Sequence, residues 1–435
     1  MDQSTTQTLK GFRDFLPEKM RVRNCVQKIL QESFEEFGFE PLQTPSLEYA
    51  ETLLKKYSAE NDKETYIFED LGKRKVGLIY DLTVPVARVL SQVDNNIVMP
   101  FKRYQIQRCY RAEKPQRGRF REFVQCDIDI FGVTSELADA EVLACGYKAT
   151  QKLGFTNFSF LINDRNTLFE ILQKAGVSEP NKQLSVLRSL DKLEKIGQKA
   201  VSRELASKRF PTAQTALIFS LISQSKPSEN LINITNYAVA LGVPKEKLIF
   251  SPTLSRGADY YTGMVVEGVV TEPKIGSILG GGRYDKLIES FGGKPTPATG
   301  ISFGFERVCE VVEELDLLKN VINAYPAKVL ICPILNNPQD LLPATMREAL
   351  WVGQTLRQNN IPTDIFLKPQ DSLAKQIKYA NAKNIPYIMV IGSDEVEKNV
   401  VSLKNLATRE QQSLPLKQAI KFINLPACHT KSCHC

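Results

Sequence analysis

Histidine is almost missing from this 435-residue sequence: the only two are His429 and His434, within the last seven residues. This excludes a Ser-His-Asp triad, a histidine general base and a histidine-rich metal centre from the body of the chain. Any catalysis must therefore use carboxylates, arginines, a bound metal or groups of the substrate itself.

Long hydrophobic runs are missing too. No segment approaches the ~18 consecutive apolar residues of a membrane-spanning helix, and the first residues lack the apolar centre of a signal peptide. The nine cysteines are odd in number and scattered, which does not favour a disulfide framework. We therefore expect a cytoplasmic protein without membrane contact. At ~100–200 residues per domain, the length corresponds to two to four domains.

The net charge of +7 is mild, but basic residues are concentrated between residues 99 and 123. Eight Lys and Arg occur there against two Glu, and they alternate with aromatic and apolar residues. This alternation predicts strands with arginines on one face of a sheet, a surface suited to a polyanion such as a nucleoside triphosphate. A salt-bridged, solvated sheet face is the alternative.

Periodicity outlines the organisation of the chain. Residues 18–38 have the pattern of an amphipathic helix, and residues 101–106 and 120–131 that of a long antiparallel hairpin. A βαβαβ alternation near the end predicts a compact α/β domain with a parallel sheet. We divide the chain into a core at 1–164, a helical insertion at 165–250, the continued core at 251–322, the α/β domain at 326–425 and a tail at 426–435.

Three segments can carry chemistry. In CYRAEKPQRGRFREFVQCDID, strand geometry would place Arg111 and Glu113 on one face, and likewise Phe123, Gln125, Asp127 and Asp129. In SRGADYYTG, Arg256 beside Gly257 can stabilise charge on a phosphoryl group. In LGGGRYDKL, three glycines permit close backbone approach, although a plain tight turn is the alternative. None of these is a P-loop or a GxGxxG fingerprint, so an arginine-bearing antiparallel sheet is the expected platform.

Together these segments resemble class II aminoacyl-tRNA synthetases. FGFEPLQTPSLE, which contains Pro45, is similar to motif 1, CYRAEKPQRGRFREFVQCDIDIFG to motif 2 and ATGISFGFERV to motif 3. SRGADYYTG and GGGRYDKL resemble the two motifs peculiar to histidyl-tRNA synthetases, and Tyr80–Arg88 resembles their amino-acid pocket segment. The resemblance runs in order from about Gly11 to Leu425, which is essentially the whole chain.

The resemblance implies a fold and an activity. The fold would be an α+β catalytic core, with helices flanking an antiparallel sheet, followed by a C-terminal α/β anticodon-binding domain. Histidine and ATP would give histidyl-adenylate, and the acyl group would pass to tRNA. The implied partners are L-histidine, ATP with bound Mg²⁺, tRNA and a second copy of the chain in a homodimer; no metal ligand from the protein is expected.

The same resemblance implies roles for individual residues. Arg256 and Arg111 would be catalytic, Arg256 by stabilising the α-phosphate. ATP would be bound by Arg111, Glu113, Arg119, Phe123 and Arg307, with Phe123 stacked on the adenine. Histidine would be bound by Asp81, Thr83, Gln125, Asp129, Tyr260, Tyr261 and Tyr284. Adenylation needs no general base, because the attacking carboxylate is already ionised, so a chain without histidine in its body can catalyse it by positioning and charge stabilisation.

Two alternatives stay open. The chain could be a non-catalytic, synthetase-like regulatory subunit of histidine biosynthesis, or an RNA-binding paralogue without turnover. The retained arginines and the extra C-terminal domain favour the enzyme. Separately, the tail Cys428–Cys435 has three Cys and two His, a spacing that can bind Zn²⁺ or Cu, although an incidental terminus is the simpler interpretation.

Overall fold

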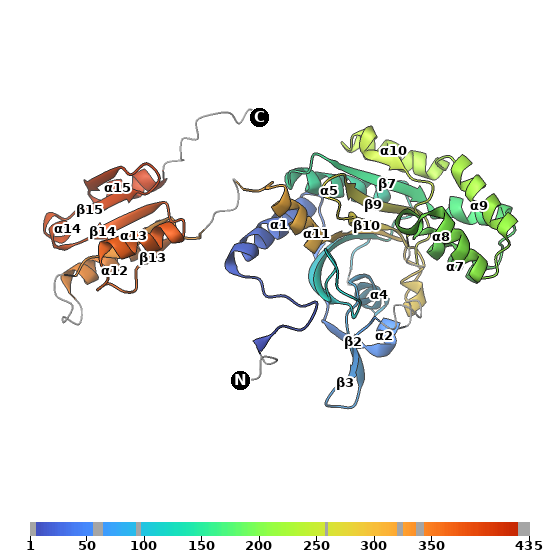
Figure 1. The fold of residues 1–435 in the computed structure, drawn as a ribbon, viewed down its shortest axis with the longest axis horizontal. Helices are drawn as coiled ribbons and strands as arrows, with labels where there is room; N and C mark the ends of the chain where they lie inside the picture. The colour runs from blue at the N-terminus through green and yellow to red at the C-terminus, as the bar shows by residue number, and fades with distance from the viewer. Residues whose placement is uncertain are drawn as a thin grey trace. The chain divides into compact units, whose positions relative to one another are not determined.

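The computed structural model describes residues 6–54, 64–92, 97–256, 260–319, 325–335 and 343–424. Its contacts divide the chain into two compact units, residues 1–319 and 320–435 (Figure 1). Gly257 and the tail Cys428–Cys435 lie outside the described residues. In the part of the chain that is described, no helix combines the length and the apolar character that crossing a membrane requires.

The first unit contains a large mixed sheet. In the described part of the chain it has the strand order β1-β5-β6-β11-β10-β9-β7-β8. The strands are β1 (Glu40–Pro41), β5 (Phe101–Tyr110), β6 (Glu122–Phe131), β7 (Phe158–Asp164), β8 (Leu248–Phe250), β9 (Met264–Val270), β10 (Ser277–Arg283) and β11 (Ala298–Gly304). Pairing is antiparallel from β5 to β7 and parallel at both edges. The expected antiparallel platform is therefore confirmed, with a parallel strand added on each side.

Helices α1 (Pro17–Glu36), α5 (Glu136–Lys152) and α11 (Phe305–Glu314) cover one face of this sheet (Figure 1). Pro17 suits the first turn of α1 because its missing N–H would have no helical partner there. Phe34 of α1 is fully buried and packs against Tyr104 of β5 and Phe303 of β11. Because strand side chains alternate, the neighbouring residues of β5, β6 and β11 project from the opposite face.

The hairpin of β5 and β6 corrects two expectations. Strand β5 continues to Tyr110 instead of ending at residue 106, and β6 begins at Glu122 instead of residue 120. Arg111 and Glu113 lie beyond the end of β5, so the idea that strand geometry places them on one face was wrong. The basic run does not line one face either. Arg103 projects opposite to Lys102 and Arg108, and the later arginines lie in the connecting loop.

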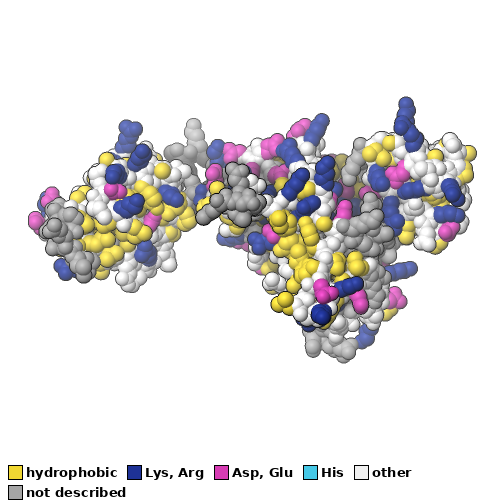
Figure 2. All heavy atoms as spheres, turned by 60° about the horizontal axis from the view of Figure 1, so that its bottom comes forward, with side chains coloured by type: hydrophobic (Ala, Val, Ile, Leu, Met, Phe, Trp, Pro, Cys, Tyr) yellow, Lys and Arg dark blue, Asp and Glu magenta, His cyan; other side chains and the backbone are white. Residues whose placement is uncertain are grey.

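A small antiparallel sheet stands beside helices α2 (Ala50–Leu54) and α4 (Thr83–Gln92). Its strands, in spatial order, are β2 (Leu47–Tyr49), β4 (Lys75–Leu78) and β3 (Ile67–Glu69). Four large apolar side chains on β2 and β3 are 37–58% exposed: Leu47, Tyr49, Ile67 and Phe68. Figure 2 shows hydrophobic side chains gathered on the face that carries this sheet.

Between residues 165 and 250 the described backbone is predominantly helical. The helices are α6 (Arg165–Lys174), α7 (Pro180–Leu190), α8 (Leu193–Ser207), α9 (Thr212–Gln224) and α10 (Glu229–Ala240), followed by the 3₁₀ turn η2 (Lys245–Lys247). Helices α6 to α9 share a hydrophobic core of their own, in which Leu187, Val201 and Ile218 are almost completely buried. Gly197, with φ of 76°, interrupts α8.

The second unit is an α/β layer with strand order β13-β12-β14-β15-β16. Its elements are β12 (Val329–Pro333), α12 (Ala344–Gln358), β13 (Thr363–Ile365), α13 (Leu373–Ala382), β14 (Tyr387–Ile391), α14 (Ser393–Lys398), β15 (Val401–Asn405), β16 (Gln411–Leu414) and α15 (Leu416–Asn424). The predicted parallel sheet is confirmed for β13, β12 and β14, but β15 and β16 add antiparallel strands. Strand β16 has the sequence QQSL and is largely exposed, so it lacks the hydrophobic alternation that identifies strands.

Candidate functional site

A row of polar side chains lies on the face of the large sheet that the helices leave open. Gln125, Asp127 and Asp129 alternate along β6, and each is less than 9% exposed. The Gln125 amide Nε2 lies 3.2 Å from Asp127 Oδ1 and 3.1 Å from Oγ of Ser302 on β11. This confirms the predicted shared face of β6, and the contacts fix each side chain before any ligand arrives.

The carboxylate of Asp129 is held from two sides. Arg103, its cross-strand partner on β5, places Nη2 at 2.6 Å from Oδ2, and the Tyr284 hydroxyl donates to Oδ1. The backbone of Gly300 on β11 passes directly beneath, where a Cβ would overlap the carboxylate. Burial raises the pKa of Asp129, while the Arg103 guanidinium opposes that rise. Burial also raises the pKa of Asp127, to about 7.

Asp81 and Thr83 enter the site at the start of α4. Thr83 is the first residue of this helix, and the Val84 N–H donates to Asp81 Oδ1 at 3.0 Å. Asp81 is 7% exposed, and its charge acts on Asp129 and on Tyr260. The structure therefore brings together the acids that the sequence predicted for one pocket, from segments about 50 residues apart.

Three tyrosines form an aromatic wall beside these acids. The Tyr260 ring lies 4.8 Å from that of Tyr261 and 5.8 Å from that of Tyr284, centroid to centroid. Burial raises the pKa of Tyr260 and of Tyr284 well above the ordinary value, so both hydroxyls stay neutral donors. A flat, polar ring would find both an apolar surface and hydroxyl groups here.

Arg111 joins this pocket to its neighbour. Although it lies outside the strand, its Nε donates to the Tyr80 carbonyl at 3.2 Å and its Nη2 to Gln125 Oε1 at 3.4 Å. Its guanidinium carbon lies 4.8 Å from the centre of the Phe123 ring. Arg111 thus contacts both Gln125, beside the acids, and the half-buried Phe123.

A second group of charges consists of Glu113, Arg119 and Arg307. Arg119 Nη1 is 3.4 Å from Glu113 Oε2, and Arg307 Nη1 donates to the Ser277 carbonyl at 2.6 Å. Burial, and next the neighbouring charge of Arg119, lower the pKa of Arg307. These two guanidinium groups repel each other in a partly buried place, and a bound anion would reduce that repulsion.

Arg256 lies over the glycine strand β10. Its backbone is left-handed, with φ of 54°, and its Nη1 lies 2.7 Å from Glu267 Oε1 on β9. Gly280 lies directly below the guanidinium: a Cβ on Gly280 would lie only 2.7 Å from the Arg256 Cζ. The alternative of a tight turn at LGGGR is wrong, because these glycines lie within a strand, where they permit close packing.

Arg103, Ser302 and Glu267 also belong to this group of residues, although no sequence pattern identifies them. Arg103 was counted only as one charge in a basic run, and Ser302 and Glu267 lie in strands without a distinctive pattern. Their roles follow from the register of strands that are distant in sequence, which pairs Arg103 with Asp129 and Ser302 with Asp127.

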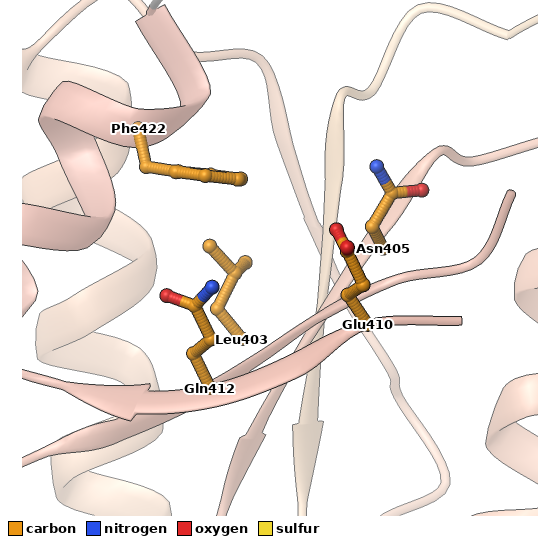
Figure 3. A pocket seen from close by; sticks show the side chains of 5 residues that line it. All are labelled: Leu403, Asn405, Glu410, Gln412 and Phe422. Atoms are coloured by element: carbon orange, nitrogen blue, oxygen red, sulfur yellow. The ribbon is translucent and has the colours of Figure 1, made fainter. Parts of the chain in front are cut away.

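A hollow in the first unit has a free volume of about 450 Å³ and is lined by Arg117, Phe120, Glu310, Glu313 and Glu314. A hollow in the second unit, lined by Leu403, Asn405, Glu410, Gln412 and Phe422, has a free volume of about 10 Å³, roughly that of one water molecule (Figure 3). Among the described residues, no group of three or more His, Cys, Asp and Glu side chains is placed to hold a metal ion.

Comparison with known proteins gives a consistent family. The family model for histidyl-tRNA synthetase matches residues 11–308, and the model for an anticodon binding domain matches residues 328–424. Relatives include histidine–tRNA ligases of Clostridium tetani (34% identical, covering 95% of this chain and 97% of that protein), Rhodopirellula baltica (36%, covering 94% and 95%) and Aeropyrum pernix (36%, covering 95% and 97%).

Solved structures agree with the fold. The histidyl-tRNA synthetase from Nostoc sp. PCC 7120 superposes with a TM-score of 0.80 at 27% identity, covering 96% of this chain and 98% of that one. An ATP phosphoribosyltransferase regulatory subunit/histidyl-tRNA synthetase from Bacillus halodurans has a TM-score of 0.70 at 21% identity, covering 89% and 98%, which shows a common fold alone. The resemblance identified from sequence motifs is confirmed.

Two neighbouring glycines of β10 should respond differently to a methyl group. Gly280→Ala should change stability little and displace Arg256 from Glu267, because the flexible guanidinium can move. Gly281→Ala should lower the free energy of unfolding by about 1–3 kcal/mol, because its Cβ would overlap the backbone of Gly300. Thermal unfolding and crystal structures of both variants test this; an undisturbed Arg256–Glu267 pair in Gly280→Ala would contradict it.

Proposed function

Since this chain belongs to the histidyl-tRNA synthetase family and therefore charges tRNA with histidine using ATP, we propose that both steps take place on the polar face of its large sheet. The observation that carries this proposal is the position of Arg111. Its guanidinium contacts Gln125 beside the acids and lies over Phe123. The charge of Glu113, in the second group, acts on both Arg111 and Arg307. An amino acid and a nucleotide bound on either side would meet at this side chain.

The cluster of Asp81, Gln125, Asp127 and Asp129 is the proposed histidine subsite. Asp81, Thr83, Gln125 and Asp129 would bind the ammonium group, since carboxylate and amide oxygens accept hydrogen bonds from a buried cation. The tyrosine wall would enclose the imidazole, with neutral hydroxyls near its nitrogens; it consists of Tyr260, Tyr261 and Tyr284. The pocket needs no histidine of its own.

The second group of charges is the proposed ATP subsite. Arg111 and Arg307 would contact phosphates, Phe123 would stack on the adenine, and Glu113 with Arg119 would border the nucleotide. Mg²⁺ would enter bound to ATP, without a ligand from the protein. Bound Mg²⁺ would neutralise part of the triphosphate charge.

Arg256 is the proposed catalytic residue for adenylation. The histidine carboxylate would attack the α-phosphorus, forming the acyl–phosphate bond while the bond to pyrophosphate breaks. No proton needs to be removed, because the carboxylate is already ionised. Arg256, held over β10 by Glu267 and admitted by Gly280, would stabilise the charge that develops on the α-phosphate oxygens.

Three further points complete the proposal. The second unit would bind the tRNA anticodon region, as its family suggests. Two copies would associate through the small sheet, where Leu47, Tyr49 and Phe68 are exposed on one face. The enzyme would act in the cytoplasm. The alternative of a regulatory subunit is not favoured, because the similar proteins named above as ligases cover almost the whole chain.

The function is tested directly by ATP–pyrophosphate exchange with each amino acid in turn. We expect exchange that depends on histidine and on no other amino acid, followed by charging of tRNA when it is added. If none of the amino acids supports exchange, the chain does not catalyse adenylation, and the alternative of a regulatory subunit is favoured.

Replacing Arg256 should separate catalysis from binding. Arg256→Ala should lower the rate of adenylation about 10²–10³-fold, because one oriented cation is lost, while histidine affinity changes much less. Single-turnover adenylation and equilibrium histidine binding provide the two measurements. Arg108→Ala removes an exposed arginine from the helix side of the sheet and is the matched control. Equal losses of rate and affinity in Arg256→Ala would contradict the phosphate role.

The interface can be tested by placing a charge on the small sheet. Phe68→Asp should weaken dimerisation at least about tenfold, because it would bury an unpaired carboxylate between copies. Ile232→Asp on α10 changes a side chain of similar exposure away from this sheet and should leave dimerisation unchanged. Sedimentation equilibrium measures both, and equal dissociation constants for the two variants would exclude this face.

A further inference from the structure

Arg103 is a fully buried cation beneath the histidine subsite. It is 0% exposed, and its Nη2 lies 2.6 Å from Asp129 Oδ2 and 4.0 Å from Asp127 Oδ2. Its Nη1 donates to Gln105 Oε1 at 3.2 Å, which anchors the guanidinium from its own strand. Side chains around it leave no room for a substrate atom, so any role of Arg103 must act through its neighbours.

The neighbours of Arg103 form a pair of like charges. Asp127 and Asp129 are both buried on the same face of β6, two residues apart, and each would raise the cost of ionising the other. Arg103 is the cation that acts most strongly on both. Arg103 lies closer to Asp129 than to Asp127, so it favours ionisation of Asp129 more.

Groups on every adjoining strand or loop complete this arrangement. From β11, Ser302 contacts the same cluster through Gln125, and from the loop after β10 the Tyr284 hydroxyl donates to Asp129. From the start of α4, Asp81 adds a further negative charge that disfavours ionisation of Asp129. Of these charged neighbours, Arg103 alone favours the ionised form of Asp129.

We propose that Arg103 is a positioning residue for histidine binding: it keeps Asp129 ionised and fixes its orientation, so that the substrate finds a charged acceptor already in place. The proposal rests on the assignment of Asp129 to the histidine subsite. A carboxylate has about four acceptor positions. The Tyr284 hydroxyl occupies one of them on Oδ1, and Arg103 lies against Oδ2 as an ion pair without a hydrogen bond, so acceptor positions remain for the substrate.

Loss of the cation has a defined consequence. Without Arg103, Asp127 and Asp129 would share a proton near neutral pH, as closely spaced buried carboxyls do. Histidine would then bind only after that proton is lost, so its affinity would fall most at low pH. The ATP subsite, on the other side of Arg111, would be unaffected.

The test uses the full-length enzyme and steady-state pyrophosphate exchange between pH 6 and 9. Arg103→Met should raise the KM for histidine at least about tenfold at pH 7 and leave the KM for ATP unchanged. It should also move the acidic limb of kcat/KM for histidine to higher pH by about one unit. Arg103→Lys, which keeps a cation, should fall between Arg103→Met and the wild type.

Two further variants isolate the cause. Lys102→Met removes a positive charge from the adjacent position of β5, on the helix side of the sheet where Lys102 pairs with Glu141, and should match the wild type. Asp127→Asn removes the competing anion: added to Arg103→Met it should restore much of the histidine affinity, and alone it should move the acidic limb to lower pH. If Arg103→Met does not fold, the pH profile of Asp127→Asn alone still tests the proposal.

The possible outcomes distinguish failure of the proposed function or histidine subsite from failure of the positioning role of Arg103. No histidine-dependent exchange by the wild type would overturn the function itself, and an unchanged histidine KM in Asp129→Asn would overturn the subsite. If Asp129→Asn impairs histidine binding but Arg103→Met resembles Lys102→Met, the positioning role alone is wrong. The same holds if Arg103→Met raises both KM values equally, or if Asp127→Asn neither rescues it nor shifts the pH profile.

Discussion

The two-sided character of the large sheet is the constraint on which the rest of the molecule depends. One face must be apolar to bury helices α1, α5 and α11, so the alternate residues of the same strands are free to be polar. On β6 those alternate residues are Gln125, Asp127 and Asp129, buried by surrounding segments and hydrogen-bonded to one another. The scaffold and the proposed binding surface are therefore built from the same strands, and hydrogen bonds hold the polar side chains in place.

A polar surface held in place by hydrogen bonds suits a reaction that needs orientation more than proton transfer. An ionised carboxylate attacks a phosphorus atom, so arginines that are fixed in advance can supply the stabilisation without rearranging. The contacts of the structure fix two of them: Glu267 holds Arg256, and the Tyr80 carbonyl holds Arg111. This explains physically how a body without histidine can act on histidine.

Much of this arrangement could be predicted from sequence where a local pattern existed. The amphipathic helix α1, the hairpin of β5 and β6 and the α/β order of the second unit all have strong periodicity. The pattern failed for Arg111 and Glu113, because strand alternation was extended past the end of β5. For GGGR the expected close backbone approach agrees with the structure, and only the alternative of a tight turn was wrong. Strand β16 had no pattern to find.

The sequence by itself determined which residue types were available, which of them were spaced for one face of a strand, and to which family the motifs belong. Only the tertiary structure decided that Arg103 lies under Asp129, that Ser302 meets Gln125 and that Gly280 admits Arg256. The physical reason is that strand register and packing join segments more than 20, and in one case more than 170, residues apart. No local pattern encodes which residue of one strand will face which residue of another.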